Sequence, residues 1–167
     1  MGLLWLLRFF LSLYVENDLR LDKYFAETDE KGFRKNKKAG SNNYLCTFRV
    51  GEIYLTAAEA AARLGELSQA RTRLLELMRK RYAPEAYEAK SVVVNAMDKE
   101  ALVQEILDER ARELAFEGHR WFDLRRSTRP RLEKVLDGTR YVLEENDARY
   151  TLAIPKEAIE ANPGLLN

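Results

Sequence analysis

Histidine and cysteine are almost missing from this chain of 167 residues, which contains one of each, His119 and Cys46. A single cysteine cannot form an internal disulfide, and the two residues are too few for a zinc site built from histidine and cysteine. A metal site would therefore have to consist of carboxylates, and no cofactor is expected. Cys46 lies in an apolar, strand-like run over residues 44–50, where a buried free thiol is more common than a catalytic nucleophile.

An excess of charge of one sign is also missing, because 28 Lys and Arg residues balance 27 Asp and Glu residues, for a net charge of +1. Such a chain has no field that would attract a nucleic acid, so no nucleic-acid partner is expected. The dense basic stretch over residues 31–43 lacks regularly interleaved aromatic residues and is interpreted as a solvated loop. Glycine-rich phosphate loops and G-x-S-x-G elbows do not occur.

Long apolar runs are missing as well. The first 15 residues, MGLLWLLRFFLSLYV, are interrupted by Arg8 and followed directly by polar residues, so they fit neither a secretory signal nor a span of ~20 apolar residues. Their apolar spacing predicts an amphipathic helix that packs against another part of the protein. With 46% hydrophobic and 33% charged residues, we expect a single domain over residues 1–167. Because the sequence opens directly with a core-forming helix, we expect this domain to be part of a longer chain.

Residues 49–81 carry the pattern of a helical hairpin. Helices are predicted over residues 52–64 and 69–81, with a turn at Gly65 and Ser68 as the N-cap of the second helix. Its small residues are spaced as in tetratricopeptide repeats, and one such hairpin cannot bury both of its faces. The expected fold is therefore mainly α, a tetratricopeptide-like helical hairpin scaffold with irregular loops.

The second half of the chain is predicted to contain one long helix. Residues 82–97 suggest a connecting loop, after which Asp98 caps a helix that is expected to end near Gly118, with its charged residues on a second, partly buried face. A short helix follows over residues 121–126, so that residues 98–126 form one helical region. In the tail, residues 141–167, strands are predicted at 141–146 and 149–155, a helical turn at 156–160 and a turn at 162–164.

The stretch ERARELAFEGHRWFDLRR, residues 109–126, mixes many charged side chains with aromatic ones. The simplest interpretation is a surface helix whose charges pair locally. A structural alternative is that bidentate pairs between arginine and carboxylate, held against Trp121 and Phe122, lock two helices together. Catalysis by Glu113, Glu117 or Asp123 is disfavoured, because neighbouring arginines would keep these carboxylates ionised.

Four motifs of the chain, in their order and rough spacing, resemble the C-terminal region of the SusD/RagB family. They are E-x-Y-L-x-x-A-E-A-x-x-x-x-G from Glu52 to Gly65, the stretch from Glu109 to Arg126, I-P-x-x-x-I-x-x-N-P from Ile154 to Pro163, and E-N-D-x-R from Glu16 to Arg20. The resemblance covers nearly the whole chain, and the motif over residues 109–126 is long and specific.

This resemblance implies a non-enzymatic lipoprotein on the outer face of the outer membrane of Bacteroidetes-type bacteria. Such proteins bind oligosaccharides or other nutrients above a SusC-like TonB-dependent transporter, and their scaffold is all-α and tetratricopeptide-based. By the same resemblance, the lipid anchor that joins the protein to the membrane is expected outside this chain, and family members are usually several times the length of a small domain. The resemblance implies a structural role for a set of signature residues: Arg110, Glu113, Arg120, Trp121, Asp123 and Arg125. No ligand-binding residue is assigned, although Tyr82, Tyr87 and Tyr141 are candidates for contact with sugar.

Two other classes of function stay open at this stage. A small helical adaptor would bind a peptide in the groove of its hairpin, without glycan or membrane. A glycosidase would need a pair of catalytic carboxylates. The identity of the nutrient, and whether the chain is a natural short form or a fragment, also stay open.

Overall fold

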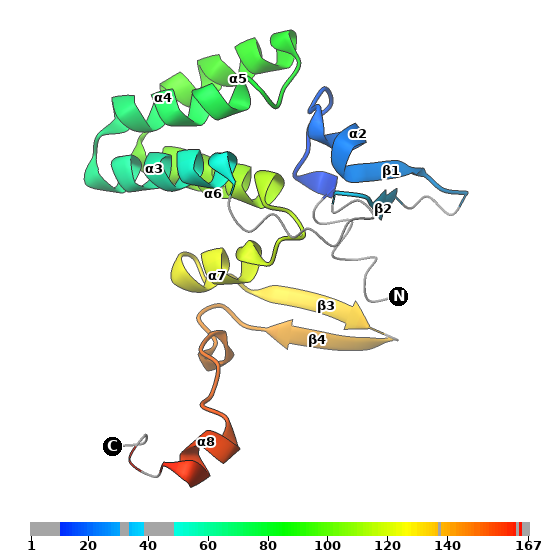
Figure 1. Ribbon diagram of the computed structural model, residues 1–167, viewed down its shortest axis with the longest axis vertical. Helices are drawn as coiled ribbons and strands as arrows, with labels where there is room; N and C mark the ends of the chain where they lie inside the picture. Colours follow the sequence, from blue (N-terminus) through cyan, green and yellow to red (C-terminus); the bar gives the residue numbers. More distant parts are fainter. Residues whose placement is uncertain (1–10, 31–33, 39–48, 137, 163, 165–167) are drawn as a thin grey trace. The chain divides into compact units, whose positions relative to one another are not determined.

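The computed structural model describes residues 11–30, 34–38, 49–136, 138–162 and 164. The described residues up to Arg120 form one compact unit, and those from Trp121 onward form a second. The described part is mainly α, as predicted, with two small two-stranded sheets (Figure 1). The expectation of a single domain stays a prediction. Most of the amphipathic helix predicted at the start of the chain, Cys46 and most of the basic stretch lie outside the described residues.

Two helices, α3 (Val50–Leu64) and α4 (Leu67–Met78), make up the hairpin of the first unit. Gly65 has the left-handed φ of 87° that the turn needs, and its N–H and that of Glu66 donate to carbonyls at the end of α3. The prediction of Ser68 as N-cap is wrong, because Ser68 lies inside α4 and Glu66 precedes that helix. The tetratricopeptide detail stays a prediction.

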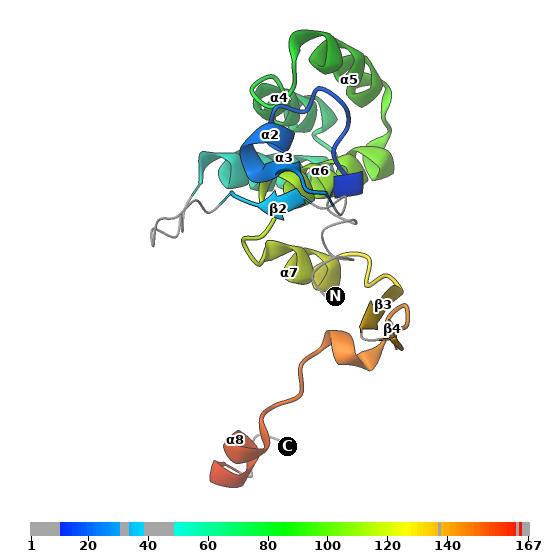
Figure 2. The same ribbon diagram turned by 90° about the vertical axis from the view of Figure 1, so that its right-hand side faces the viewer.

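The core of the first unit lies between α3, α4 and the long helix α6 (Lys99–Glu113). α3 contacts both of the other helices (Figures 1 and 2). Alanines at the contact let the helix axes approach closely, and larger side chains fill the remaining space. The fully buried members of this core are Leu55, Ala58, Ala62, Ala70, Leu74, Met78, Leu102 and Ile106.

The prediction of a loop over residues 82–97 is wrong, since α5 (Pro84–Ala96) occupies most of that range. Pro84 stands in the first helical turn, where its missing N–H costs nothing. The run of three valines suggested an extended chain, but only Val94 is buried in the core, and Val92 is 70% exposed. Tertiary packing of one valine in three therefore overrides the β propensity of the run.

Asp98 caps α6 as predicted, and its carboxylate accepts a hydrogen bond from the N–H of Ala101 at 2.9 Å. The helix ends at Glu113, earlier than Gly118 suggested. Phe116 at φ 65° and Gly118 at φ 84° then redirect the backbone. The charged face expected on this helix is buried, as the next subsection describes.

We call the described residues 11–30 and 34–38 the arm. The arm contains α2 (Arg20–Tyr24) and the antiparallel strands β1 (Phe25–Thr28) and β2 (Arg34–Asn36). The backbone N–H of Leu19 donates to the carbonyl of Arg81 at 2.9 Å, and that of Ala83 donates to the carbonyl of Asn17 at 3.0 Å. The arm is therefore attached to the chain just after α4. Of the predicted strand-like run over residues 44–50, residues 44–48 lie outside the described residues, and Val50 is the first residue of α3.

The second unit starts within α7 (His119–Arg126), whose first two residues belong to the first unit. The elements that follow are the hairpin of β3 (Leu132–Leu136) and β4 (Thr139–Leu143), the 3-10 helix η1 (Ala148–Tyr150) and α8 (Lys156–Ala161). β4 covers the first half of the predicted strand at 141–146, of which residues 144–146 are not strand, and α8 matches the predicted turn of helix. The predicted strand at 149–155 is wrong, because the Asp147 carboxylate caps η1 through the N–H of Arg149. Tyr150 stacks on Trp121, with ring centroids 5.2 Å apart.

Leu74→Ala should lower the free energy of unfolding by about 2 to 5 kcal/mol, because it opens a cavity where α4 enters the core. Urea denaturation of the 167-residue chain measures this change. The matched control is Leu64→Ala, which removes the same atoms from a side chain that is 78% exposed and should change stability by less than about 0.5 kcal/mol. Equal effects of the two substitutions would contradict the packing described above.

Candidate functional site

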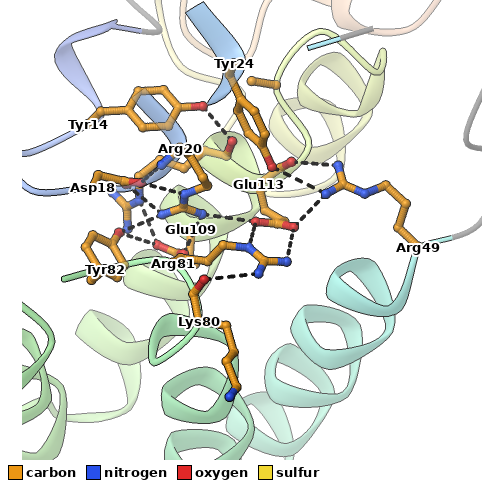
Figure 3. A network of polar contacts seen from close by, with 12 residues as sticks. Tyr14, Asp18, Arg20, Tyr24, Arg49, Lys80, Arg81, Tyr82, Glu109 and Glu113 are labelled. Carbon is orange, nitrogen blue, oxygen red and sulfur yellow. Dashed lines mark hydrogen bonds and ion pairs between the residues drawn. The ribbon is translucent and has the colours of Figure 1, made fainter. Parts of the chain in front are cut away.

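A cluster of buried charges lies where α6 meets the arm and the end of α4 (Figure 3). We call it the ion-pair cluster, and its members are Asp18, Arg20, Arg49, Arg81, Tyr82, Glu109, Arg112 and Glu113. Glu109 and Glu113 are both 0% exposed. They stand four residues apart and therefore on one face of α6. Two ionised carboxylates removed from water in this way are unstable unless cations surround them.

Arg20 is the cation at the centre of the cluster, and only 2% of its surface is exposed. Its Nη1 donates to Glu109 at 2.7 Å and to Glu113 at 3.2 Å. Its Nε and Nη2 donate to the two carboxylate oxygens of Asp18 at 2.9 and 2.8 Å, and Nη2 also donates to the Tyr82 hydroxyl at 2.9 Å. This one side chain thus joins the arm to two turns of α6.

The carboxylate of Glu113 accepts hydrogen bonds from arginines in three separate segments. Arg81 forms a two-pronged pair with it, Nε to Oε2 at 2.8 Å and Nη2 to Oε1 at 2.9 Å. Arg49, just before α3, adds a bond from Nη2 to Oε1 at 2.8 Å, and Arg20 adds the third cation. A Cβ atom on Gly51 would lie 2.7 Å from Oε1 of Glu113, so only glycine lets the first turn of α3 come this close.

The surroundings keep both glutamates ionised. Burial raises the pKa of Glu109, but Arg20 and Arg112 outweigh it and bring the pKa to about 2. Burial likewise raises the pKa of Glu113, while Arg81, Arg20 and Arg49 lower it further than burial raises it. Burial raises the pKa of the Tyr82 hydroxyl, which donates to Glu109 at 2.9 Å. Carboxylates held in this way do not carry the proton that a general acid must donate.

A further carboxylate, Glu117, joins Lys38, which follows β2, to Arg49, which precedes α3. Lys38 pairs with it at 2.5 Å, and its ammonium group also donates to the carbonyls of Glu113 and Ala115 at 2.6 and 3.0 Å. Arg49 pairs with the same carboxylate. The interpretation of the basic stretch as solvated is wrong for Lys38, whose side chain is 10% exposed and whose pKa burial lowers to about 8.

The six signature residues are divided between the two units. In the first unit Glu113 belongs to the ion-pair cluster, while Arg110 donates to the Thr56 hydroxyl at 3.1 Å and Arg120 donates to the carbonyl of Leu107 at 3.4 Å. In the second unit Trp121 stacks on Tyr150, Asp123 pairs with Arg126 at 2.6 Å, and the carbonyl of Arg125 accepts from Nε of Arg129. Their structural role stays a prediction.

Sequence reasoning missed the partners of Glu113. Arg20, Arg49 and Arg81 lie 93, 64 and 32 residues away from it along the chain, and Gly51 gave no signal at all. The sequence did contain one indication of these partners. Glu109 and Glu113 share a helix face with apolar neighbours, and carboxylates buried there need cations from other segments of the chain. Tyr82, a candidate for contact with sugar, is 2% exposed and is used in the cluster, whereas Tyr141 is 55% exposed.

Two kinds of feature are absent from the part of the chain that the structure describes. The described residues contain no group of three or more His, Cys, Asp or Glu side chains arranged to hold a metal ion. Among the same residues, no helix is both long and apolar enough to cross a membrane.

These observations define a mainly helical protein in which a buried ion-pair cluster connects an arm and a hairpin to one long helix. A model of the SusD family matches residues 15–167, and the chain belongs to that family. It is 31% identical over 115 residues to SusD-like protein P38 of Formosa agariphila. The alignment covers 68% of this chain and 22% of that relative, so the chain spans about a fifth of the relative's length.

Gly51→Ala should destabilise the chain by about 1 to 3 kcal/mol, because the added methyl group pushes the Glu113 carboxylate away from its arginines. Without that contact, the same change in a helix stabilises by about 0.5 to 1 kcal/mol. Urea denaturation of single and double variants measures both effects. In a Glu113→Ala background the clash is gone, so the substitution should become neutral or stabilising. An identical cost in both backgrounds would refute the close contact.

The free energy of unfolding should fall as the pH drops from 4.5 to about 2, the interval between the ordinary pKa of Glu109 and its value in the folded chain. The unfolded chain binds the proton first there, so acid favours unfolding. Urea denaturation at a series of pH values measures the slope. Glu109→Gln should flatten it, whereas Glu100→Gln, at an exposed position of the same helix, should leave it unchanged. Equal slopes in both variants would count against the paired carboxylate.

Proposed function

We propose that this chain is the C-terminal scaffold part of a cell-surface protein that binds glycans or other nutrients and delivers them to a SusC-like TonB-dependent transporter in the outer membrane. The observation that carries the proposal is the match to the SusD family over residues 15–167. The match includes the arm, the hairpin and the long helix, that is, every segment that contributes to the ion-pair cluster. A lipid anchor on another part of the protein would hold it at the membrane.

The proposed role is binding rather than catalysis. Of the acidic side chains considered for catalysis, Glu113 is buried and paired with arginines, and so is its neighbour on α6, Glu109. A retaining or inverting glycosidase needs one carboxyl group that is protonated and another that reaches the sugar. The low pKa and the burial of these glutamates support a structural use of both.

The ion-pair cluster suits a scaffold that carries binding loops. Charged hydrogen bonds are directional, so each arginine fixes the position of the segment that bears it and not merely its proximity. Sugar rings would then be held by aromatic side chains and by polar groups that bind hydroxyls, at sites supported by this frame.

A tagged form of the protein, expressed from its own gene, tests this proposal. It should fractionate with the outer membrane, be cleaved by protease added to intact cells, and copurify with a TonB-dependent transporter from detergent extracts. The purified complex should bind a glycan on which the organism grows, measured by calorimetry. A periplasmic protein in the same cells is the control and must stay uncleaved. Recovery inside the cell with a peptide-bearing partner and no transporter would refute the proposal and favour the helical adaptor.

A further inference from the structure

The hairpin of β3 and β4 (Figure 1) has two unlike faces. Its register pairs Lys134 directly with Tyr141 and Leu136 with Thr139, and directly opposite residues of an antiparallel pair lie on the same face. Side chains alternate between the two faces along each strand. One face, which we call the Tyr141 face, therefore carries Leu132, Lys134, Leu136, Thr139, Tyr141 and Leu143.

The charges of the opposite face neutralise one another. The carboxylate of Glu133 accepts hydrogen bonds from Arg131 at 3.0 Å and from Arg140 at 2.6 Å. Arg131 also donates to the carboxylate of Glu144 at 3.1 Å. Exposed pairs of this kind add little to stability, but they leave this face without an uncompensated charge that a ligand could use.

Lys134 differs from the other cations of the hairpin. Among the described residues between 131 and 149, it is the only cation for which the structure records neither an ion pair nor a hydrogen bond. None of the residues of the Tyr141 face is acidic. Lys134 is half-buried, and the stem of such a lysine covers apolar surface while its ammonium group stays in water. The charge on this face is therefore available to an anion.

Tyr141, directly opposite Lys134, is 55% exposed, and the Cβ atoms of such a pair are about 5 Å apart. An exposed tyrosine ring offers a flat apolar surface on which the C–H face of a sugar can stack. An ammonium group beside it binds a carboxylate or a sulfate as a point charge. Thr139, two residues along the same strand and roughly 7 Å away, adds a hydroxyl that both donates and accepts.

Two other occupants fit the Tyr141 face less well. A protein segment packed on its leucines would bury the ammonium group of Lys134 without a counter-charge, which is costly. A single-stranded nucleic acid needs a row of cations and successive aromatic side chains, whereas this face has one of each. A sugar unit with one negative group matches both side chains at once.

We propose that the Tyr141 face is a subsite for an anionic sugar, that is, a sugar unit with a carboxylate or a sulfate group. Tyr141 stacks on the sugar ring, Lys134 binds the negative group, and Thr139 binds a hydroxyl. The inference rests on the proposed function, because it names the chemical class of the nutrient that the same protein delivers.

Affinity electrophoresis of the 167-residue chain tests this subsite. The native gels contain polygalacturonate, dextran sulfate or, as the neutral polymer, dextran. The unchanged chain should be retarded by at least one of the two polyanions and not by dextran. Tyr141→Ala and Lys134→Gln should each weaken this binding roughly tenfold, whereas Lys134→Arg, which keeps the charge, should restore it. Circular dichroism checks that each variant is folded.

Two control variants separate the subsite from a general attraction to polyanions. Phe122→Ala removes an aromatic ring that is 61% exposed on α7, and Lys156→Gln removes a positive charge from the surface of α8. Both should be retarded as strongly as the unchanged chain. If they lose as much binding as the variants of Tyr141 and Lys134, the attraction is non-specific and the proposal is wrong.

Two further results would overturn the proposal. One is the absence of retardation by either polyanion. The other is retardation by dextran that Lys134→Gln leaves unchanged, which would assign the face to a neutral sugar. Surface location and copurification with the transporter are measured separately and do not depend on this hairpin, so failure here is distinguishable from failure of the proposed function.

Discussion

The carboxylate of Glu113 is the point on which the positions of the other segments depend. It accepts hydrogen bonds from an arginine in the arm, one before α3 and one after α4, and α3 approaches it so closely that Gly51 has no room for a side chain. Buried ion pairs are not reliably stabilising in sum, because removing charges from water is costly. Charged hydrogen bonds are directional, so they fix how the segments are placed. Removal of one partner would also leave the other charges buried without compensation. The cluster therefore specifies an arrangement rather than merely adding stability.

The parts of this fold that the sequence predicted are those set by local pattern. The hairpin of α3 and α4, the start of α6 at Asp98 and the strand at β4 follow from spacing, capping and turn residues that are close together in the chain. The failures have the opposite cause. α5 is a helix because Val94 reaches the core, and no local signal in the run of valines reports that contact. Likewise the predicted strand after Asp147 gave way to a side-chain cap.

The candidate site was predicted only in part, because some of its residues lie in one local motif and their partners lie far away in the sequence. The long charged motif drew attention to α6, and the expectation of a partly buried charged face was correct. The motif nevertheless suggested partners within itself, whereas the arginines on Glu113 come from three other segments. Charge type and helix spacing show that a glutamate needs cations, but they do not show which of the many arginines in a chain supplies them. That choice is made by the three-dimensional path of the backbone.

The attachment of the arm has a consequence for the order in which the protein is made. Arg20 leaves the ribosome before its partner Glu109, which follows 89 residues later, a delay on the order of ten seconds at ordinary rates of synthesis. Throughout that interval the arm has no α6 on which to dock. Asp18 and Arg20, which supply its ionic attachment, stay hydrated in water during that interval at no cost, whereas Phe25, which is 1% exposed in the folded unit, has to wait as an exposed apolar side chain. An arm fastened by apolar side chains alone would expose a larger apolar surface for the same time, so the ionic part of the attachment limits the apolar surface that the unfinished chain presents.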